Sequence, residues 1–184
     1  MIGIDIIDLS CSFSQTRHSL DDYKNKILCK SEFPYCNSFS NLEYLWAIKE
    51  SAYKCHYKKS GKSFLNPKKI LITDLDWTLC TFNVIIEDLS YLGSFHATDE
   101  YIYSICFDNT RDTKDVRVFI GSDMSHFNKD EVDFYSQKSK INASFQHHSM
   151  GFAQGLILGN NQFAYSRSHH GSYYISAITP YSHN

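Results

Sequence analysis

The chain has 184 residues, of which 42% are apolar and 21% charged, and its net charge is −2. This length predicts one domain, residues 1–184, with enough chain to bury a core. The near-neutral charge argues against nucleic acid or an anionic membrane as the partner.

No stretch approaches the ~20 apolar residues of a membrane span. The first ten residues have no basic targeting segment, so we expect a cytoplasmic protein. The six cysteines form no C-x-x-C pair, which there indicates reduced thiols.

The beginning of the chain predicts one strand and two helices. Residues 2–9 contain four isoleucines and predict a short buried strand. Residues 17–30 predict a polar helix and residues 42–59 an amphipathic one. Asn41 is the expected N-cap of the second helix. Lysines followed by Gly61 predict where that helix ends.

From residue 69 onward, short apolar or alternating runs separated by turn residues predict strands. Residues 124–146 interrupt them and predict a helix, and His147 and His148 follow as expected loop residues. The sequence "SHHGS" at 168–172 predicts a hairpin turn. These runs together indicate an α+β fold in which an antiparallel sheet packs with helices. The predicted strands are residues 68–76, 78–88, 90–97, 100–108, 163–167 and 173–179.

Two charged motifs interrupt the apolar pattern. Asp5 stands in the isoleucine-rich strand, where an unpaired carboxylate would cost several kcal/mol, so it needs a partner. On the helix of residues 42–59, Trp46, Glu50 and Lys54 recur every four residues and share one face. A solvated Glu–Lys pair is the ordinary interpretation of that face. Asp5 and Glu50 together would instead suit Mg²⁺, with Lys54 facing phosphate oxygens as a point charge.

A third motif lies at the predicted hairpin. Ser166, Ser168 and His169 precede Gly171, and hydroxyls and an imidazole beside a glycine can approach an anion closely. An ordinary polar hairpin is the alternative.

In order, "GID" at 3–5, "WAIKESAYK" at 46–54 and "S-x-S-H" at 166–169 resemble the 4'-phosphopantetheinyl transferases. Their order resembles that of the short, single-lobe holo-acyl-carrier-protein synthase type. The resemblance implies a single lobe of that α+β fold. Residues 65–160 match no motif of the family, so they would form an inserted or extended β-rich middle region. The short type also implies a possible homo-trimer.

The resemblance further implies a reaction. The 4'-phosphopantetheine moiety of coenzyme A would be transferred to a serine of an apo-acyl carrier protein of fatty acid or polyketide biosynthesis, with release of 3',5'-ADP. Asp5 and Glu50 would hold Mg²⁺ against the pyrophosphate, and Lys54 would neutralise the β-phosphate region. Either Glu50 or a water on the metal would take the proton of the serine. The residues implied to meet the 3'-phosphate are Ser166, Ser168 and His169.

An alternative enzyme class comes from Asp74-x-Asp76-x-Thr78, which follows an apolar run. It resembles the first motif of haloacid-dehalogenase-type phosphatases, in which Asp74 would be the nucleophile and Mg²⁺ would lie between the two aspartates. Trp77 stands where that family has a small glycine. A β-turn between two strands is the simpler interpretation, because Asp is common in turns. A non-catalytic carrier-binding lobe is a third class, but the presence of Asp5, Glu50 and Lys54 favours an enzyme.

Overall fold

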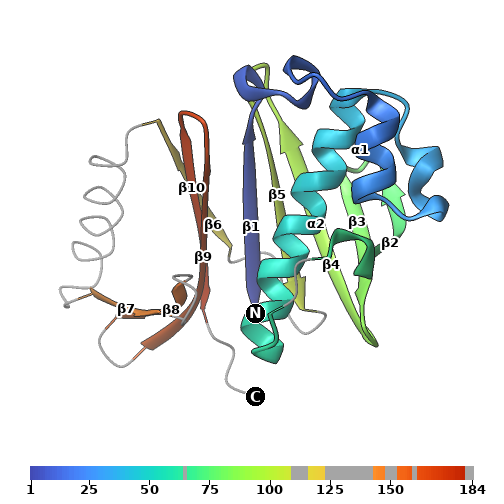
Figure 1. Ribbon diagram of the computed structural model, residues 1–184. Coiled ribbons are helices and arrows are strands. Elements are labelled where there is room, and N and C mark those ends of the chain that lie inside the picture. The colour runs from blue at the N-terminus through green and yellow to red at the C-terminus, as the bar shows by residue number, and fades with distance from the viewer. Residues whose placement is uncertain (64–65, 109–115, 123–142, 148–152, 159–160, 181–184) are drawn as a thin grey trace.

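The computed structural model describes residues 1–63, 66–108, 116–122, 143–147, 153–158 and 161–180. The strands of these residues form two five-stranded antiparallel sheets that stand side by side, and the helices cover one of them (Figure 1). The predicted α+β class, with an antiparallel sheet packed with helices, is confirmed. None of the helices in the described ranges is long and apolar enough to cross a membrane.

The first sheet has the order β1-β5-β4-β3-β2, so β1 and β2 are its edge strands. All neighbouring pairs are antiparallel, and the strands from β2 to β5 follow one another as hairpins. The runs predicted as strands in the first 108 residues are therefore strands. Their bounds are β1 Ile2–Asp8, β2 Ile70–Asp76, β3 Thr81–Ile86, β4 Leu89–Ala97 and β5 Tyr101–Asp108.

The long helix α2, Phe39–Ser60, lies across β1 and β5 (Figure 1). Its N-cap is Ser38, so the prediction that Asn41 is the N-cap is wrong. The Ser38 hydroxyl accepts the Asn41 N–H at 3.1 Å and donates to the Asn41 side-chain oxygen at 3.0 Å. Asn41 thus closes the first turn from inside the helix, which begins earlier than predicted. The predicted end is confirmed, since Gly61 adopts φ 70° and its N–H bonds to the Tyr57 carbonyl.

The predicted polar helix of residues 17–30 is shorter in the structure. It spans Leu20–Ile27 as α1, and its N-cap is Ser19, which forms a capping box with Asp22. The 3₁₀ helix Lys30–Tyr35 follows it, and the buried Glu32 pairs there with Lys49 of α2 at 2.8 Å. The remaining 3₁₀ turns are Leu9–Cys11, Phe13–Gln15 and Pro67–Lys69.

The second sheet has the order β6-β10-β9-β8-β7. The predicted hairpin is confirmed, with Gly171 at φ 55° in the turn. The helix predicted over residues 124–146 is wrong at its end, because residues 143–147 pair with β8 as a strand. His147 therefore lies in a strand and not in the predicted loop, while His148 and residues 124–142 lie outside the described residues. The bounds are β6 Arg117–Gly121, β7 Ala143–His147, β8 Ala153–Leu158, β9 Asn161–His170 and β10 Tyr173–Pro180.

Strand β1 connects the two sheets. Its Ile2, Ile4 and Ile6 enter a core shared with β5, β9 and β10. The alternate residues face α2, and a Cβ added to Gly3 would overlap the Ser51 carbonyl. The glycine therefore allows β1 and α2 to cross closely. This alternation directs the side chain of Asp5 toward α2.

Candidate active site

Asp5 and Lys54 form an ion pair where β1 crosses α2. The Lys54 Nζ lies 2.6 Å from Asp5 Oδ1, and the two side chains are only 8% and 9% exposed. The same ammonium donates to the Ile4 carbonyl at 3.2 Å. The buried carboxylate thus has the partner that its position in an apolar strand requires.

Glu50 precedes Lys54 by one helical turn and is partly buried. Burial, and after it the negative charge of Asp5, raise the pKa of Glu50 to about 7, although the positive charge of Lys54 acts in the opposite direction. Asp5 and Glu50 are therefore close enough to repel each other. A carboxyl with such a pKa changes protonation near neutral pH, which suits proton transfer.

Strand β9 brings a third component. The Ser168 hydroxyl donates to Asp5 Oδ1 at 2.7 Å and accepts from Lys54 Nζ at 2.8 Å. Two residues earlier, the buried Ser166 hydroxyl accepts the Ile4 N–H at 3.1 Å. Two residues later, His170 Nδ1 accepts the Asp8 N–H at 3.0 Å. Alternate side chains of β9 thus line the open edge of β1.

His169 points to the other face of β9. It is exposed, and its ring stacks on Tyr174 with 5.8 Å between the centroids. The structure thus brings Asp5, Glu50, Lys54 and Ser168 together but does not bring His169 to them. Sequence reasoning missed His170 as a contact of β1. The period-two spacing of Ser166, Ser168 and His170 could have identified it.

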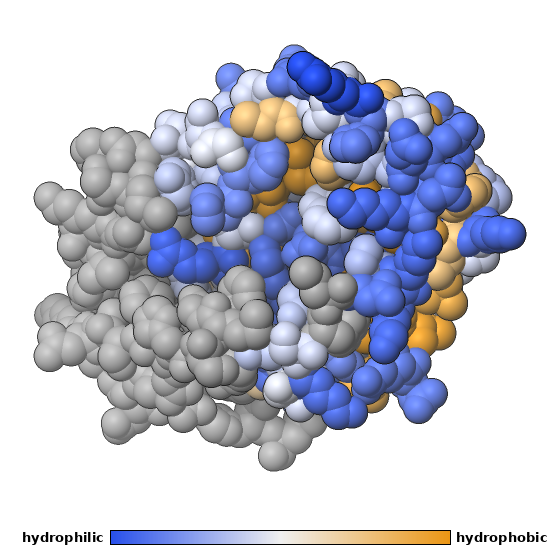
Figure 2. Space-filling view, viewed as in Figure 1, coloured by the Kyte–Doolittle hydropathy of each residue, from blue (hydrophilic) through white to orange (hydrophobic). Residues whose placement is uncertain are grey.

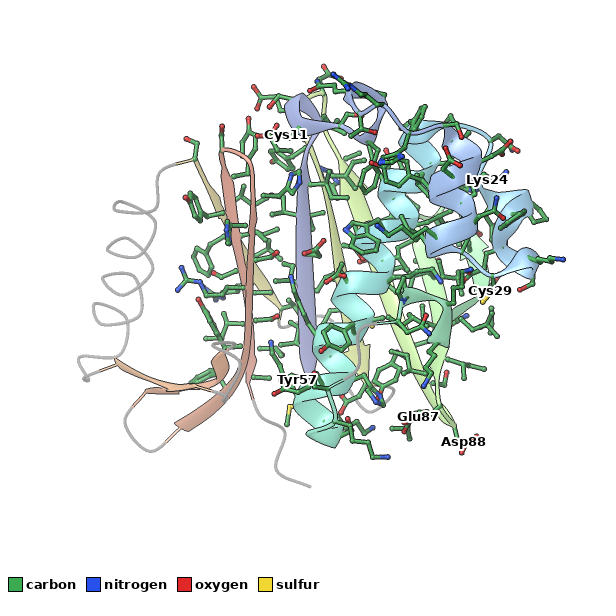
Figure 3. All side chains as sticks on the ribbon, in the orientation of Figure 1. Cys11, Lys24, Cys29, Tyr57, Glu87 and Asp88 are labelled. Carbon is green, nitrogen blue, oxygen red and sulfur yellow. The ribbon has the colours of Figure 1, made fainter. Side chains whose placement is uncertain are left out.

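The lysines at and just after the end of α2 already have hydrogen-bond or ion-pair partners within the chain. Lys58 is buried and donates to the carbonyls of Ile2 and Tyr165 at 3.1 and 2.7 Å. Burial lowers the pKa of Lys58 to about 7. Tyr57, labelled in Figure 3, marks this end of the helix. Lys58 therefore ties β9 to β1. The other two lysines lie at acidic side chains, Lys59 3.8 Å from Asp108 and Lys62 3.3 Å from Glu87.

Asp74 and Asp76 lie in the antiparallel hairpin β2–β3. Asp76 Oδ1 accepts the N–H groups of Thr78 and Leu79 at 2.8 and 2.9 Å. Asp74 accepts from the Asn83 amide at 3.3 Å and is exposed. Asp76 is thus a turn residue, as the simpler interpretation predicted. The structure gives no support to the phosphatase alternative.

The carboxylate pair fits a hard divalent cation. In the described ranges no cluster of three or more Asp, Glu, His and Cys side chains is placed to hold a metal. Mg²⁺, however, commonly uses only one or two protein carboxylates and completes its shell with water and phosphate oxygens. Asp5 and Glu50 could provide such a pair, and a bound cation would offset the repulsion by Asp5, which after burial is the second cause of the raised Glu50 pKa.

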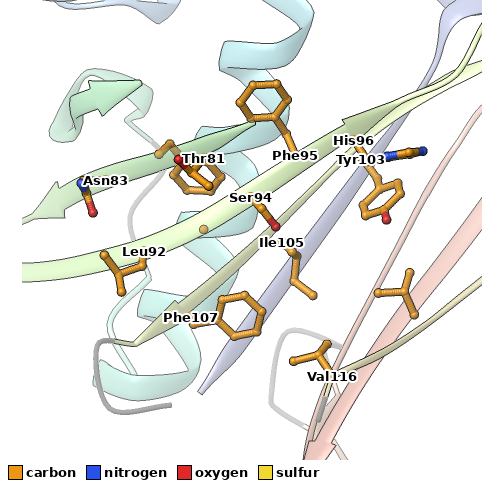
Figure 4. A pocket seen from close by; sticks show the side chains of 13 residues that line it. Thr81, Asn83, Leu92, Ser94, Phe95, His96, Tyr103, Ile105, Phe107 and Val116 are labelled. Atoms are coloured by element: carbon orange, nitrogen blue, oxygen red, sulfur yellow. The ribbon is translucent and has the colours of Figure 1, made fainter. Parts of the chain in front are cut away.

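The face shown in Figure 2 carries many hydrophilic residues over the helices, with apolar ones among them. A separate groove of about 590 Å³ lies on the first sheet, formed by β3, β4 and β5 together with Val116 and Val118 (Figure 4). Neither Asp5, Glu50 nor Lys54 lines it. This groove is therefore distinct from the charged cluster at the crossing of β1 and α2.

A search of curated proteins found no match to the chain. The model of the 4'-phosphopantetheinyl transferase superfamily matches residues 1–106, more than half of the chain. The match includes Asp5, Glu50 and Lys54 and ends before β9. Members of this family are transferases that use coenzyme A and act on carrier proteins. The chain belongs to the 4'-phosphopantetheinyl transferase superfamily.

Proposed function

We propose that the protein transfers 4'-phosphopantetheine from coenzyme A to a serine hydroxyl of an apo-acyl carrier protein, as holo-acyl-carrier-protein synthases do. The observation that supports this proposal is the joining of Asp5, Glu50 and Lys54 at the crossing of β1 and α2. The family match supports phosphopantetheinyl transfer in general. We place the reaction in the cytoplasm, in keeping with six cysteines that are all free thiols.

Asp5 and Glu50 would hold Mg²⁺. When bound, this ion would neutralise part of the negative charge of the pyrophosphate. Lys54 would donate from its ammonium to the phosphate oxygens on which charge accumulates as the leaving group departs. In the structure this ammonium already lies beside the carboxylate of Asp5, so its charge is fixed near the site.

The proposed step forms a bond between the serine oxygen and the β-phosphorus of coenzyme A. It breaks the bond from this phosphorus to the oxygen that bridges the two phosphates, and 3',5'-ADP leaves. The serine proton needs an acceptor, and either Glu50 or a water on the metal would take this role. The contact predicted between the 3'-phosphate and the hairpin stays a prediction. Of its three residues, Ser166, Ser168 and His169, only His169 is exposed.

Intact-mass spectrometry tests the reaction. The protein is incubated with Mg²⁺, coenzyme A and an apo-acyl carrier protein, and the carrier should gain about 340 Da, the mass of phosphopantetheine. Glu50→Gln should abolish most of the gain because it removes a charged ligand and the proposed base. Asp74→Asn is the matched control and should keep wild-type activity, since Asp74 lies on an exposed hairpin. No mass gain with several carriers that a control transferase modifies would contradict the proposal.

A further inference from the structure

Ser168 makes two hydrogen bonds inside the charged cluster. It donates to Asp5 Oδ1 at 2.7 Å and accepts from Lys54 Nζ at 2.8 Å, while those two groups lie 2.6 Å apart. The three polar atoms therefore form a closed triangle. A hydroxyl has only one proton, and Ser168 gives it to Asp5, so it has none to donate to a phosphate oxygen in this arrangement.

Strand β9 holds Ser168 in place from both sides. Ser166 accepts the Ile4 N–H and His170 accepts the Asp8 N–H, and these contacts flank Ser168 along the strand. Lys58 adds a third tie, since it donates to the carbonyls of Ile2 and Tyr165. The backbone at Ser168 is thus fixed against β1. A hydroxyl on such a support can orient its neighbours without moving itself.

We propose that Ser168 is a positioning residue that orients the Asp5 carboxylate and the Lys54 ammonium for the transfer step, and that it does not bind the 3'-phosphate of coenzyme A. This inference rests on the proposed function. Ser168 lies 163 residues from Asp5 along the chain and outside the family match, which ends at residue 106. The second sheet therefore completes the arrangement of residues that the matched part of the chain provides.

Kinetics separate positioning from binding. Ser168→Ala should lower kcat about tenfold or more and change the KM for coenzyme A less than twofold, because misplaced groups act mainly on the transition state. Ser168→Thr keeps the hydroxyl and should restore kcat to within about threefold of the wild type. Ser104→Ala is the matched control. Ser104 is buried and lies opposite Asp5 in the pairing of β1 with β5, but its hydroxyl bonds to Ser51 of α2, so this variant should keep kcat.

A second readout does not depend on catalysis. Mn²⁺ replaces Mg²⁺, and the free ion is measured by electron paramagnetic resonance in the absence of coenzyme A. Ser168→Ala should bind Mn²⁺ about threefold to tenfold more weakly than the wild type, because Asp5 loses the hydrogen bond that orients it. Ser104→Ala and Ser168→Thr should bind like the wild type.

Two results would overturn the inference. One is a Ser168→Ala enzyme with an unchanged kcat and a KM for coenzyme A raised several-fold, because Ser168 would then bind the substrate. The other is unchanged Mn²⁺ affinity in Ser168→Ala. An inactive wild type that still binds Mn²⁺, with the expected loss in Ser168→Ala, would refute the proposed function and leave the positioning role supported.

Discussion

Glu50 is a carboxylate that the fold holds partly out of water beside a second carboxylate. Burial first, and then the charge of Asp5, raise the pKa of Glu50 from 4.5 to about 7. A raised pKa means that the folded state binds this proton more tightly than the unfolded chain. The stability that Glu50 contributes is therefore present below pH 4.5 and is lost as the pH rises through 7.

Glu50→Gln should remove this pH dependence. In metal-free buffer, the free energy of unfolding of the variant should rise relative to that of the wild type between pH 4.5 and 7, by up to about 3 kcal/mol. Thermal melts at pH 4.5 and 8 measure this change in stability, which corresponds to a difference in Tm of roughly 5–10 °C for a chain of this size. Glu87→Gln is the control, since that carboxylate is exposed and should shift little at either pH. An equal gain of Glu50→Gln at both pH values would contradict the assigned pKa.

The sequence predicted part of this cluster for a physical reason. Asp5 in an apolar strand requires a partner, and the helical repeat places Glu50 and Lys54 on one face. The proximity of Ser168 could not be derived in this way, because it comes from a contact between residues 114 apart. His169 was predicted as the site histidine because it matches the S-x-S-H motif, whereas the alternation of side chains along β9 directs His170 to β1.

At the scale of elements, the hairpin β9–β10 is held against the end of β1 by its turn. Gly171 has φ 55°, and a Cβ added there would overlap the carboxylate of Asp8. The same carboxylate accepts the Ser172 N–H at 2.8 Å. A side chain at position 171 would therefore both strain the turn and push it away from β1.

Gly171→Ala and Gly61→Ala form a matched pair. Gly61 also has positive φ, 70°, but nothing lies within 4 Å of an added Cβ. Gly61→Ala should cost about 1 kcal/mol of unfolding free energy from backbone strain alone. Gly171→Ala should cost at least about 1 kcal/mol more, because a buried contact must also shift. Urea denaturation measures both variants, and equal losses would show that the turn does not pack on Asp8.

The predicted elements differ from the observed ones where two local signals compete. Ser38 and Asn41 are both good N-caps, and only the observed geometry shows that Ser38 is the cap and Asn41 its partner in the first turn. The run of residues 143–147 carries no strong strand period, and its pairing with β8 decides its structure. The strands up to residue 108 were predicted correctly from short apolar or alternating runs bounded by turn residues.

At the scale of the molecule, the second sheet brings its β9 to the open edge of β1 within one chain. Sequence reasoning could not predict this, because β9 lies beyond the family match, which ends at residue 106, and the packing of two sheets depends on tertiary contacts. Ser168 reaches Asp5 and Lys54 of its own chain. This arrangement favours a proposed site that one chain completes over a site shared between the subunits of a homo-trimer.

Mixing two impaired variants tests this arrangement. One chain carries Glu50→Gln, and the other carries Ser168→Ala with His169→Ala on the hairpin. If each site is completed by its own chain, every chain in the mixture keeps one defect, so co-refolded mixtures should show no activity beyond the sum of the two variants.

If a neighbour's hairpin completed the site, mixed interfaces would pair an intact hairpin with an intact Glu50. Activity would then rise to as much as about a quarter of the wild-type level in a random mixture, by the statistics of pairing around a closed ring. Such a rise would contradict the one-chain site, and its absence would support it.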